Sequence, residues 1–178
     1  MLCHHPKCTI HIYLLIVRIG RQMDLLLLAK PGVHLYSLLY NSDTAWQAIR
    51  FYDHVNLGYG VLISVSGSVA ALALASDMRY YIQRYVTYHL FRTEHNTQMY
   101  ATPALVTSRY VHHADSFHNG WNYHLILTVT ESTEQPFICT RCECEERTSK
   151  YECEFPIQGE YGILCTKEEW EEGAIRTK

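Results

Sequence analysis

The longest uncharged run of the chain covers residues 57–75, LGYGVLISVSGSVAALALA. About 20 consecutive apolar residues can cross the hydrocarbon core of a bilayer as a helix. Core helices of soluble proteins are usually shorter and carry a polar stripe, whereas the polar side chains of this run are tyrosine and serine. The run therefore predicts a membrane-spanning helix. A buried core helix is the main alternative, and the β-branched residues Val61, Ile63, Val65 and Val69 leave a pair of strands open.

Small residues recur in this run at every fourth position. They form two series, Gly60, Ser64 and Ser68, and Gly67, Ala71 and Ala75. On a helix each series lines one face, where small side chains let two backbones approach closely in lipid. We expect the spans to form a homo-oligomer through this surface, although small residues are common in membrane helices generally.

The segment that follows, residues 77–93, is expected to be a juxtamembrane helix. Its arginines and aromatic residues alternate closely; they include Arg79, Tyr80, Tyr81, Arg84 and Tyr85. Long cations and amphipathic rings of this kind lie at the headgroup level of membrane lipid. Arginines are more numerous after the run than before it, so the C-terminal side is expected to face the cytosol.

The apolar stretches before residue 57 are each too short to span a bilayer. They are Ile10–Val17, Leu25–Ala29 and Leu35–Tyr40. Residues 23–40 could form a second, weaker membrane-associated helix, and Asp43 could cap a short helix over Asp43–Val55. We therefore expect residues 1–102 to form a membrane-associated helical region.

The second part of the chain reads as antiparallel strands. Apolar and polar residues alternate over residues 121–129, which is typical of a half-buried strand. Phe137–Cys144 and Lys150–Phe155 flank a polar loop as a hairpin does, and Tyr161–Cys165 and Ala104–Val111 are further candidate strands. The predicted fold class is α+β, with N-terminal membrane-associated helices followed by a small antiparallel β-sheet or sandwich domain at residues 103–178.

Charge divides the chain at about the same place. Residues 1–102 carry eight Lys and Arg against five Asp and Glu, a net of +3, whereas residues 103–178 carry seven against thirteen, a net of −6. The sum is the −3 of the whole chain. Because an acidic chain repels phosphate, no nucleic-acid partner is expected, even though arginines interleaved with aromatic rings can stack single strands.

Five of the seven cysteines lie after residue 138. Cys139 and Cys142 have CxxC spacing, and Cys153 and Cys165 could complete a four-thiolate metal site. A disulfide or reduced, packed thiols are the alternatives. A second group of metal-ligand residue types, His112, His113, Asp115, His118 and His124, is better explained as a polar hairpin loop, and metal binding is the alternative. Because no catalytic motif accompanies them, we expect neither an enzyme nor a bound cofactor.

The order of the parts resembles that of the coronavirus accessory channel-like membrane proteins and their relatives, the matrix proteins. Met78-Arg79-Tyr80-Tyr81, the strand Tyr123–Thr130, and Tyr161 followed by Glu169-Trp170-Glu171-Glu172-Gly173 are similar to stretches that occur there in the same order. The resemblance covers residues 57–173. It implies a viral accessory protein that is homo-oligomeric, lies in internal host membranes such as the ER or Golgi, and alters trafficking or ion balance.

Three functions follow from these features. The first is a non-enzymatic membrane protein that binds host or viral proteins through its cytosolic β domain. The second is a viroporin-like oligomer that conducts ions, although a span without charged residues does not favour a selective polar pore. The third is a soluble α+β protein with a metal site.

Overall fold

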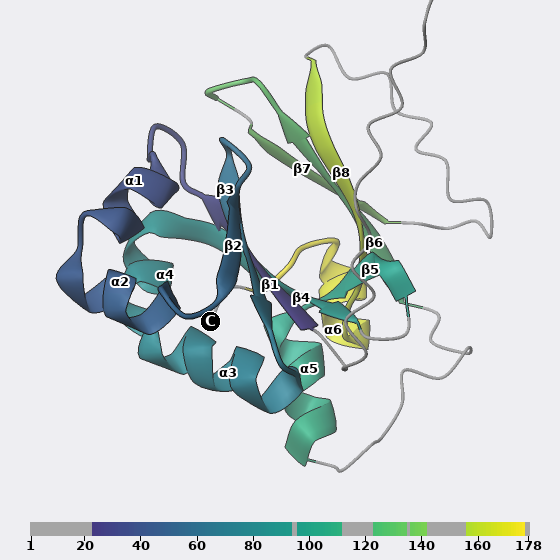
Figure 1. Cartoon of the computed structure of the whole chain (residues 1–178). Helices are drawn as coiled ribbons and strands as arrows, with labels where there is room; N and C mark the ends of the chain where they lie inside the picture. Colours follow the sequence, from purple (N-terminus) through teal and green to yellow (C-terminus); the bar gives the residue numbers. More distant parts are fainter. Residues whose placement is uncertain (1–22, 94–95, 112–122, 135, 142–155, 177–178) are drawn as a thin grey trace, which may run out of the picture.

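The computed structural model describes residues 23–93, 96–111, 123–134, 136–141 and 156–176, coloured in Figure 1. Its strands form one sheet of eight in the order β2-β3-β1-β4-β5-β8-β6-β7. The strands are β1 (Met23–Ala29), β2 (Asp53–Asn56), β3 (Gly60–Val65), β4 (Val86–Thr93), β5 (Asn96–Ala101), β6 (His124–Thr130), β7 (Phe137–Arg141) and β8 (Ile157–Leu164). The helices are α1 (Leu35–Tyr40), α2 (Asp43–Ile49), α3 (Ser68–Asp77), α4 (Arg79–Tyr85), α5 (Pro103–Val111) and α6 (Lys167–Glu172).

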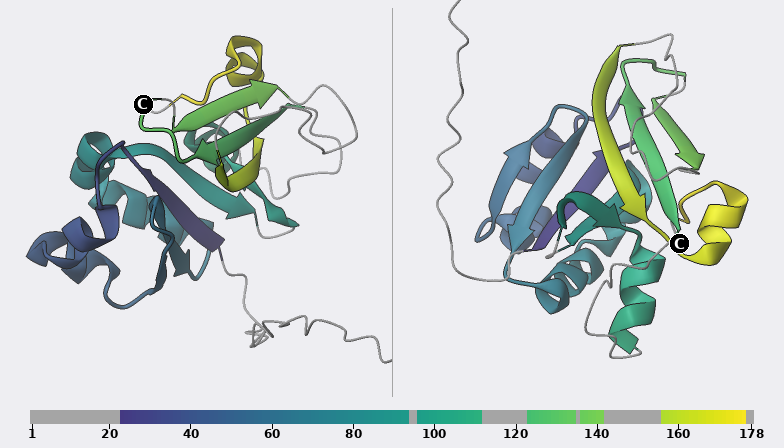
Figure 2. Two further views of the ribbon diagram at one scale, coloured as in Figure 1. Left: turned by 90° about the horizontal axis from the view of Figure 1, so that it is seen from above. Right: turned by 90° about the vertical axis from the view of Figure 1, so that its right-hand side faces the viewer.

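The sheet is mixed, and it joins the two halves of the chain. Six of its seven strand pairs are antiparallel, while β5 and β8 run parallel, with Tyr100 opposite Ile163. Because β5 and β8 lie on either side of the predicted boundary at residues 102–103, the sheet continues across it. The sheet also bends, so that β6, β7 and β8 stand over one face of β1, β3 and β4 (Figures 1 and 2).

Two hydrophobic cores follow from the alternation of side chains along the strands. Leu25 and Leu27 of β1 point to the face that helices α1 to α5 cover, whereas Leu26 and Leu28 point to the other face. There they join the second core, which includes Leu125 and Leu127 of β6. A central strand buried on both faces reads as a continuous apolar run, which explains the four successive leucines.

The prediction of a spanning helix at residues 57–75 is wrong. The run divides into strand β3 and helix α3, which are separated at Ser66 and Gly67. Val61, Ile63 and Val65 alternate into the first core, and the two series of small residues therefore do not share a helix face. Within the described residues, no helix is both long enough and apolar enough to cross a membrane. This finding contradicts the predicted transmembrane helix, and with it the predicted viroporin-like pore and the location in internal host membranes.

Other predicted helices also change type. Residues 77–93 form α4 and then β4, which begins with the β-branched Val86 and Thr87. Residues 23–40 form β1 and α1, and the helix expected over Asp43–Val55 ends at Ile49. Ser42, not Asp43, caps that helix, since its hydroxyl accepts a hydrogen bond from the Ala45 amide.

Most of the strands predicted after residue 103 are close to strands of the structure. Strands β6, β7 and β8 lie within or beside the predicted ranges, and the β6–β7 and β6–β8 pairs are antiparallel. The segment predicted as a strand at Ala104–Val111 is helix α5 instead, beginning at Pro103, a residue favoured in the first turn of a helix. The fold is thus α+β, but with one eight-stranded mixed sheet in place of membrane helices and a small separate sheet. Residues 150–155 lie outside the described residues.

Candidate functional site

A pocket of about 810 Å³ lies between α4 and β4. Its walls include Arg79, Ile82 and Gln83 from α4 and Val86, Tyr88 and His89 from β4. Thr87 of β4, Lys30, from the turn after β1, and Ile175, from the segment after α6, complete the lining. Pockets that bind small ligands commonly have volumes of about 300–1,000 Å³. The size is therefore that of a ligand site.

A tight turn positions Lys30 at this pocket. Pro31 and Gly32 occupy the central positions, Gly32 has a φ of 75°, and the Val33 amide donates to the Lys30 carbonyl at 3.0 Å. This is the pattern of a type II turn, in which the second central residue needs a positive φ. The Lys30 ammonium group donates to the carbonyl oxygens of Gln83 and Arg84, at 3.0 and 2.9 Å. A cation at the C-terminus of a helix interacts favourably with the helix dipole.

The charged side chains that line the pocket are both cationic. They are Lys30 and Arg79, and no carboxylate is among the lining residues. Within the described residues, Arg79 takes part in no ion pair or side-chain hydrogen bond. The side chains of the lining therefore carry a net positive charge.

His89 forms part of the wall from β4 and stays neutral. Burial lowers the pKa of its imidazole to about 4, because the charged form would lose its hydration. Its ring packs edge-on against Phe91, with the centroids 5.9 Å apart. No hydrogen bond joins His89 to another of the described residues, and His89 belongs to the pocket lining.

A second polar cluster lies on the opposite face of the sheet. Asp24 pairs with the Arg92 guanidinium at 2.9 Å and accepts a hydrogen bond from the Ser64 hydroxyl at 2.6 Å. Arg92 also lies over the Tyr100 ring, 5.7 Å from its centroid. Because both carboxylate oxygens of Asp24 have protein partners on neighbouring strands, this cluster holds β1, β3 and β4 together.

The residues predicted at a membrane interface belong to α4. Arg79 lines the pocket, while Tyr80, Tyr81 and Tyr85 contact one another with ring centroids 5.2–6.5 Å apart. Arg84 packs over Tyr80 and Tyr85. Of this predicted set, the structure brings only Arg79 into the pocket lining.

The residues predicted to mediate oligomerisation lie in or beside β3 and α3, within the chain's own fold. Gly60 and Ser64 lie in β3, Ser68 and Ala71 lie in α3, and Gly67 precedes α3. A Cβ atom at Gly60 would stand 2.4 Å from the Leu27 carbonyl oxygen, so β1 and β3 require glycine there. The structure gives these residues intrachain roles, and their part in self-association stays a prediction.

The predicted cysteine site is described in part. Cys139 lies in β7, Cys165 follows β8, and β6 runs between the two strands. Burial raises the pKa of Cys139 to about 11 and that of Cys165 to about 12, which keeps both thiols protonated. Cys142 and Cys153 lie outside the described residues. Within the described part of the chain, no three His, Cys, Asp or Glu residues come close enough to hold a metal ion.

Of the histidine group, only His124, in β6, belongs to the described part of the chain. His112, His113, Asp115 and His118 lie outside the described residues, so their role stays a prediction.

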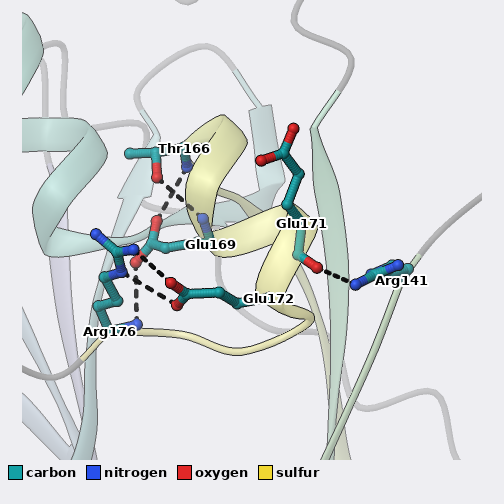
Figure 3. Close-up of polar contacts among 6 residues, drawn as sticks. All are labelled: Arg141, Thr166, Glu169, Glu171, Glu172 and Arg176. Carbon is teal, nitrogen blue, oxygen red and sulfur yellow. Dashed lines mark hydrogen bonds and ion pairs between the residues drawn. The ribbon is translucent and has the colours of Figure 1, made fainter.

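The acidic run that carries part of the family resemblance is helix α6 (Figure 3). Thr166 caps its first turn, and Glu169 is fully buried. The Glu169 carboxylate accepts hydrogen bonds from the Thr102 hydroxyl at 2.7 Å, the Thr166 amide at 2.9 Å and the Arg176 amide at 3.1 Å. Arg141 of β7 donates to the Glu171 carbonyl. The run therefore fixes the segment that carries Ile175 into the pocket wall.

Sequence reasoning missed the pocket because its residues come from distant parts of the chain. Lys30 and His89 belong to segments that the sequence predicts to be membrane-associated, and neither residue is part of a motif. The Lys30-Pro31-Gly32 turn was the one local signal, since Pro followed by Gly is typical of a tight turn.

Comparison with known proteins adds no assignment to this geometry. No protein-family model, no curated protein and no solved structure matches the chain.

Proposed function

We propose that this protein binds a small organic anion in the pocket between α4 and β4. The observation that carries the proposal is that both charged lining residues, Lys30 and Arg79, are cations. A guanidinium group matches the geometry of a carboxylate or phosphate, with two parallel N–H donors. Lys30 holds a fixed position because α4 carbonyls accept two of its hydrogen bonds.

The other lining residues indicate which chemical groups the anion has besides its charge. Ile82, Val86 and Ile175 supply apolar contact surface, and the neutral His89 ring and the Gln83 side chain supply polar groups. A ligand that fits all of these has a charged end and a carbon-containing body. Apolar contact surface beside placed polar groups occurs in many small-molecule sites.

Binding, and not catalysis, is the activity proposed. Within the described residues, His89 is not hydrogen-bonded to a nucleophile of the lining. The Thr87 hydroxyl, which also belongs to the lining, donates to the Ala29 carbonyl. The pocket lining thus offers charge and shape without a paired nucleophile and base.

Titration of isotope-labelled protein with butyl phosphate tests this proposal, with 1-butanol as the matched neutral compound. Amide and side-chain signals of Arg79, Gln83 and His89 should shift with butyl phosphate in a saturable manner, and 1-butanol should leave them unchanged. Equal shifts with both compounds, or saturable shifts confined to other parts of the protein, would refute the proposal.

A further inference from the structure

Strand β2 forms one edge of the sheet. Its partner is β3, with His54 opposite Ile63 and Val55 opposite Leu62. Within the described part of the chain, no strand pairs with the outer side of β2. An edge strand presents backbone N–H and C=O groups along its outer side, and another strand can add to them.

The hairpin between β2 and β3 determines which backbone groups point outward. The Leu57 amide donates to the Gly60 carbonyl at 2.9 Å, so these two residues form a hydrogen-bonded pair. In an antiparallel ladder such pairs alternate with pairs that exchange no hydrogen bonds. The backbone of Val55 is therefore bonded towards β3, whereas the N–H and C=O groups of His54 and Asn56 point away from it.

Strand β2 lacks several features that keep edge strands from pairing. Lysine, proline and β-bulges are common protections of an edge. The sequence of β2, Asp53-His54-Val55-Asn56, contains neither lysine nor proline, and its register with β3 is continuous. The strand is short, with four residues, so that a contact through it has few hydrogen bonds. We therefore expect a weak but specific contact.

Exposed apolar side chains lie at this edge. Val55 is 54% exposed, and Phe51, two positions before the strand, is 79% exposed. Tyr40 is 57% exposed and packs edge-on against Trp46. The Trp46 ring in turn contacts the ring of His54, with the centroids 5.6 Å apart. Neighbouring exposed apolar groups of this kind commonly mark a surface that contacts another protein.

We propose that β2 pairs with β2 of a second copy of this chain, in an antiparallel contact with Val55 on a two-fold axis. In this register His54 of each copy exchanges backbone hydrogen bonds with Asn56 of the other copy. About four hydrogen bonds then satisfy the outward groups of both strands. Val55 faces its own counterpart in a pair without hydrogen bonds, where side chains approach most closely. The inference is independent of the proposed anion site.

The residues of this edge suit a second copy of the same chain. In the proposed register Asp53 lies opposite Leu57 of the second copy, so no like charges face each other across the strands. Residues 50–57 carry one arginine, Arg50, and one aspartate, Asp53, and their charges cancel. Two-fold dimers are also the commonest symmetric assemblies, because one self-complementary surface serves both copies.

Sedimentation velocity of the whole chain, from about 1 to about 300 µM, tests the inference. The unaltered chain should show a monomer–dimer equilibrium in this range. Val55→Lys should weaken the dimer at least about tenfold, because it places two ammonium groups opposite each other at the axis. Val69→Lys is the matched control, since Val69 is 61% exposed but lies in α3, and it should leave the dimer unchanged.

Cross-linking tests the register without an added charge. Val55→Cys should form an intermolecular disulfide in air with a copper–phenanthroline catalyst. Residues that face each other in such a pair have Cα atoms about 4.5 Å apart, which a disulfide can bridge. Val69→Cys and the unaltered chain, which has seven cysteines of its own, are the controls. Peptide mass spectrometry identifies the linked positions.

Two results would overturn the inference. A monomer at every concentration would show that β2 does not pair with itself, and would leave the edge to a strand of another protein or to solvent. A dimer that Val55→Lys and Val69→Lys weaken equally, or that neither variant weakens, would be formed through another surface. Absence of a disulfide between the two copies at position 55, in a protein that does dimerise, would contradict the register.

Discussion

The Lys30 ammonium group donates a hydrogen bond to the backbone carbonyl oxygen of Arg84 at 2.9 Å. This contact joins the turn after β1 to the last turn of α4, across 54 positions of the sequence. It places a cation at the wall of the pocket between α4 and β4 and satisfies a carbonyl that has no partner within the helix. Structure and proposed binding therefore depend on the same side chain.

Replacing Lys30 with methionine should destabilise the fold by about 1–2 kcal/mol. The substitution keeps the length of the side chain but removes two hydrogen bonds to the C-terminus of α4 and the favourable interaction with its dipole. Urea denaturation measures the change in the free energy of unfolding. Lys167→Met is the control, because Lys167 forms an exposed ion pair with Glu171 and should cost less than about 0.5 kcal/mol. Equal costs for both variants would contradict the role given to Lys30.

His89 should make stability depend on pH. Its pKa is about 4 in the folded protein and about 6.5 when unfolded, so between these values the unfolded chain binds a proton that the folded chain does not. Stability is therefore full above about pH 6.5 and falls as the pH drops towards 4, by on the order of 2 kcal/mol for this half-buried group. His89→Gln should remove that part of the pH dependence. Parallel stability curves for the two proteins from pH 7.5 to 4.5 would show that the pKa of His89 is not lowered.

Gly60→Ala should be strongly destabilising, by about 3 kcal/mol or more. The added Cβ would stand 2.4 Å from the Leu27 carbonyl oxygen, so the β1–β3 pairing would have to shift in a close-packed core. Ser68→Ala, in α3, should stay within about 0.5 kcal/mol. Thermal unfolding of both variants at several protein concentrations checks this. A cost at Gly60 that appears only at high concentration would favour the self-association predicted from the sequence over the intrachain role.

The sequence-based predictions succeeded and failed for identifiable physical reasons. Alternation of apolar and polar residues located β6, because one face of that strand is buried and the other is not. The same reasoning failed for β3, whose Val61 and Leu62 enter different cores. A strand buried on both faces, followed directly by an apolar helix, has the same hydropathy as a membrane span.

The candidate site could not be predicted because its parts meet only in the folded chain. Arg79 and His89 are ten positions apart, and the β1–β4 pairing brings Lys30 beside them. Arg79 was singled out for its charge, but its aromatic neighbours suggested a lipid surface. The contact between the end of α4 and the turn at Lys30 follows from the order of the strands in the sheet. No local sequence pattern predicts it.

The affinity of Arg79→Gln for butyl phosphate tests the central claim most directly. Arg84→Gln is the matched control, because it removes the same charge from the same helix at a side chain outside the pocket lining. We expect Arg79→Gln to lose at least about tenfold in affinity, because a charged hydrogen bond worth about 1.5–3 kcal/mol is removed. Arg84→Gln should change the affinity less than about twofold. Equal losses in the two variants, or unchanged affinity in Arg79→Gln, would contradict an anion site between α4 and β4.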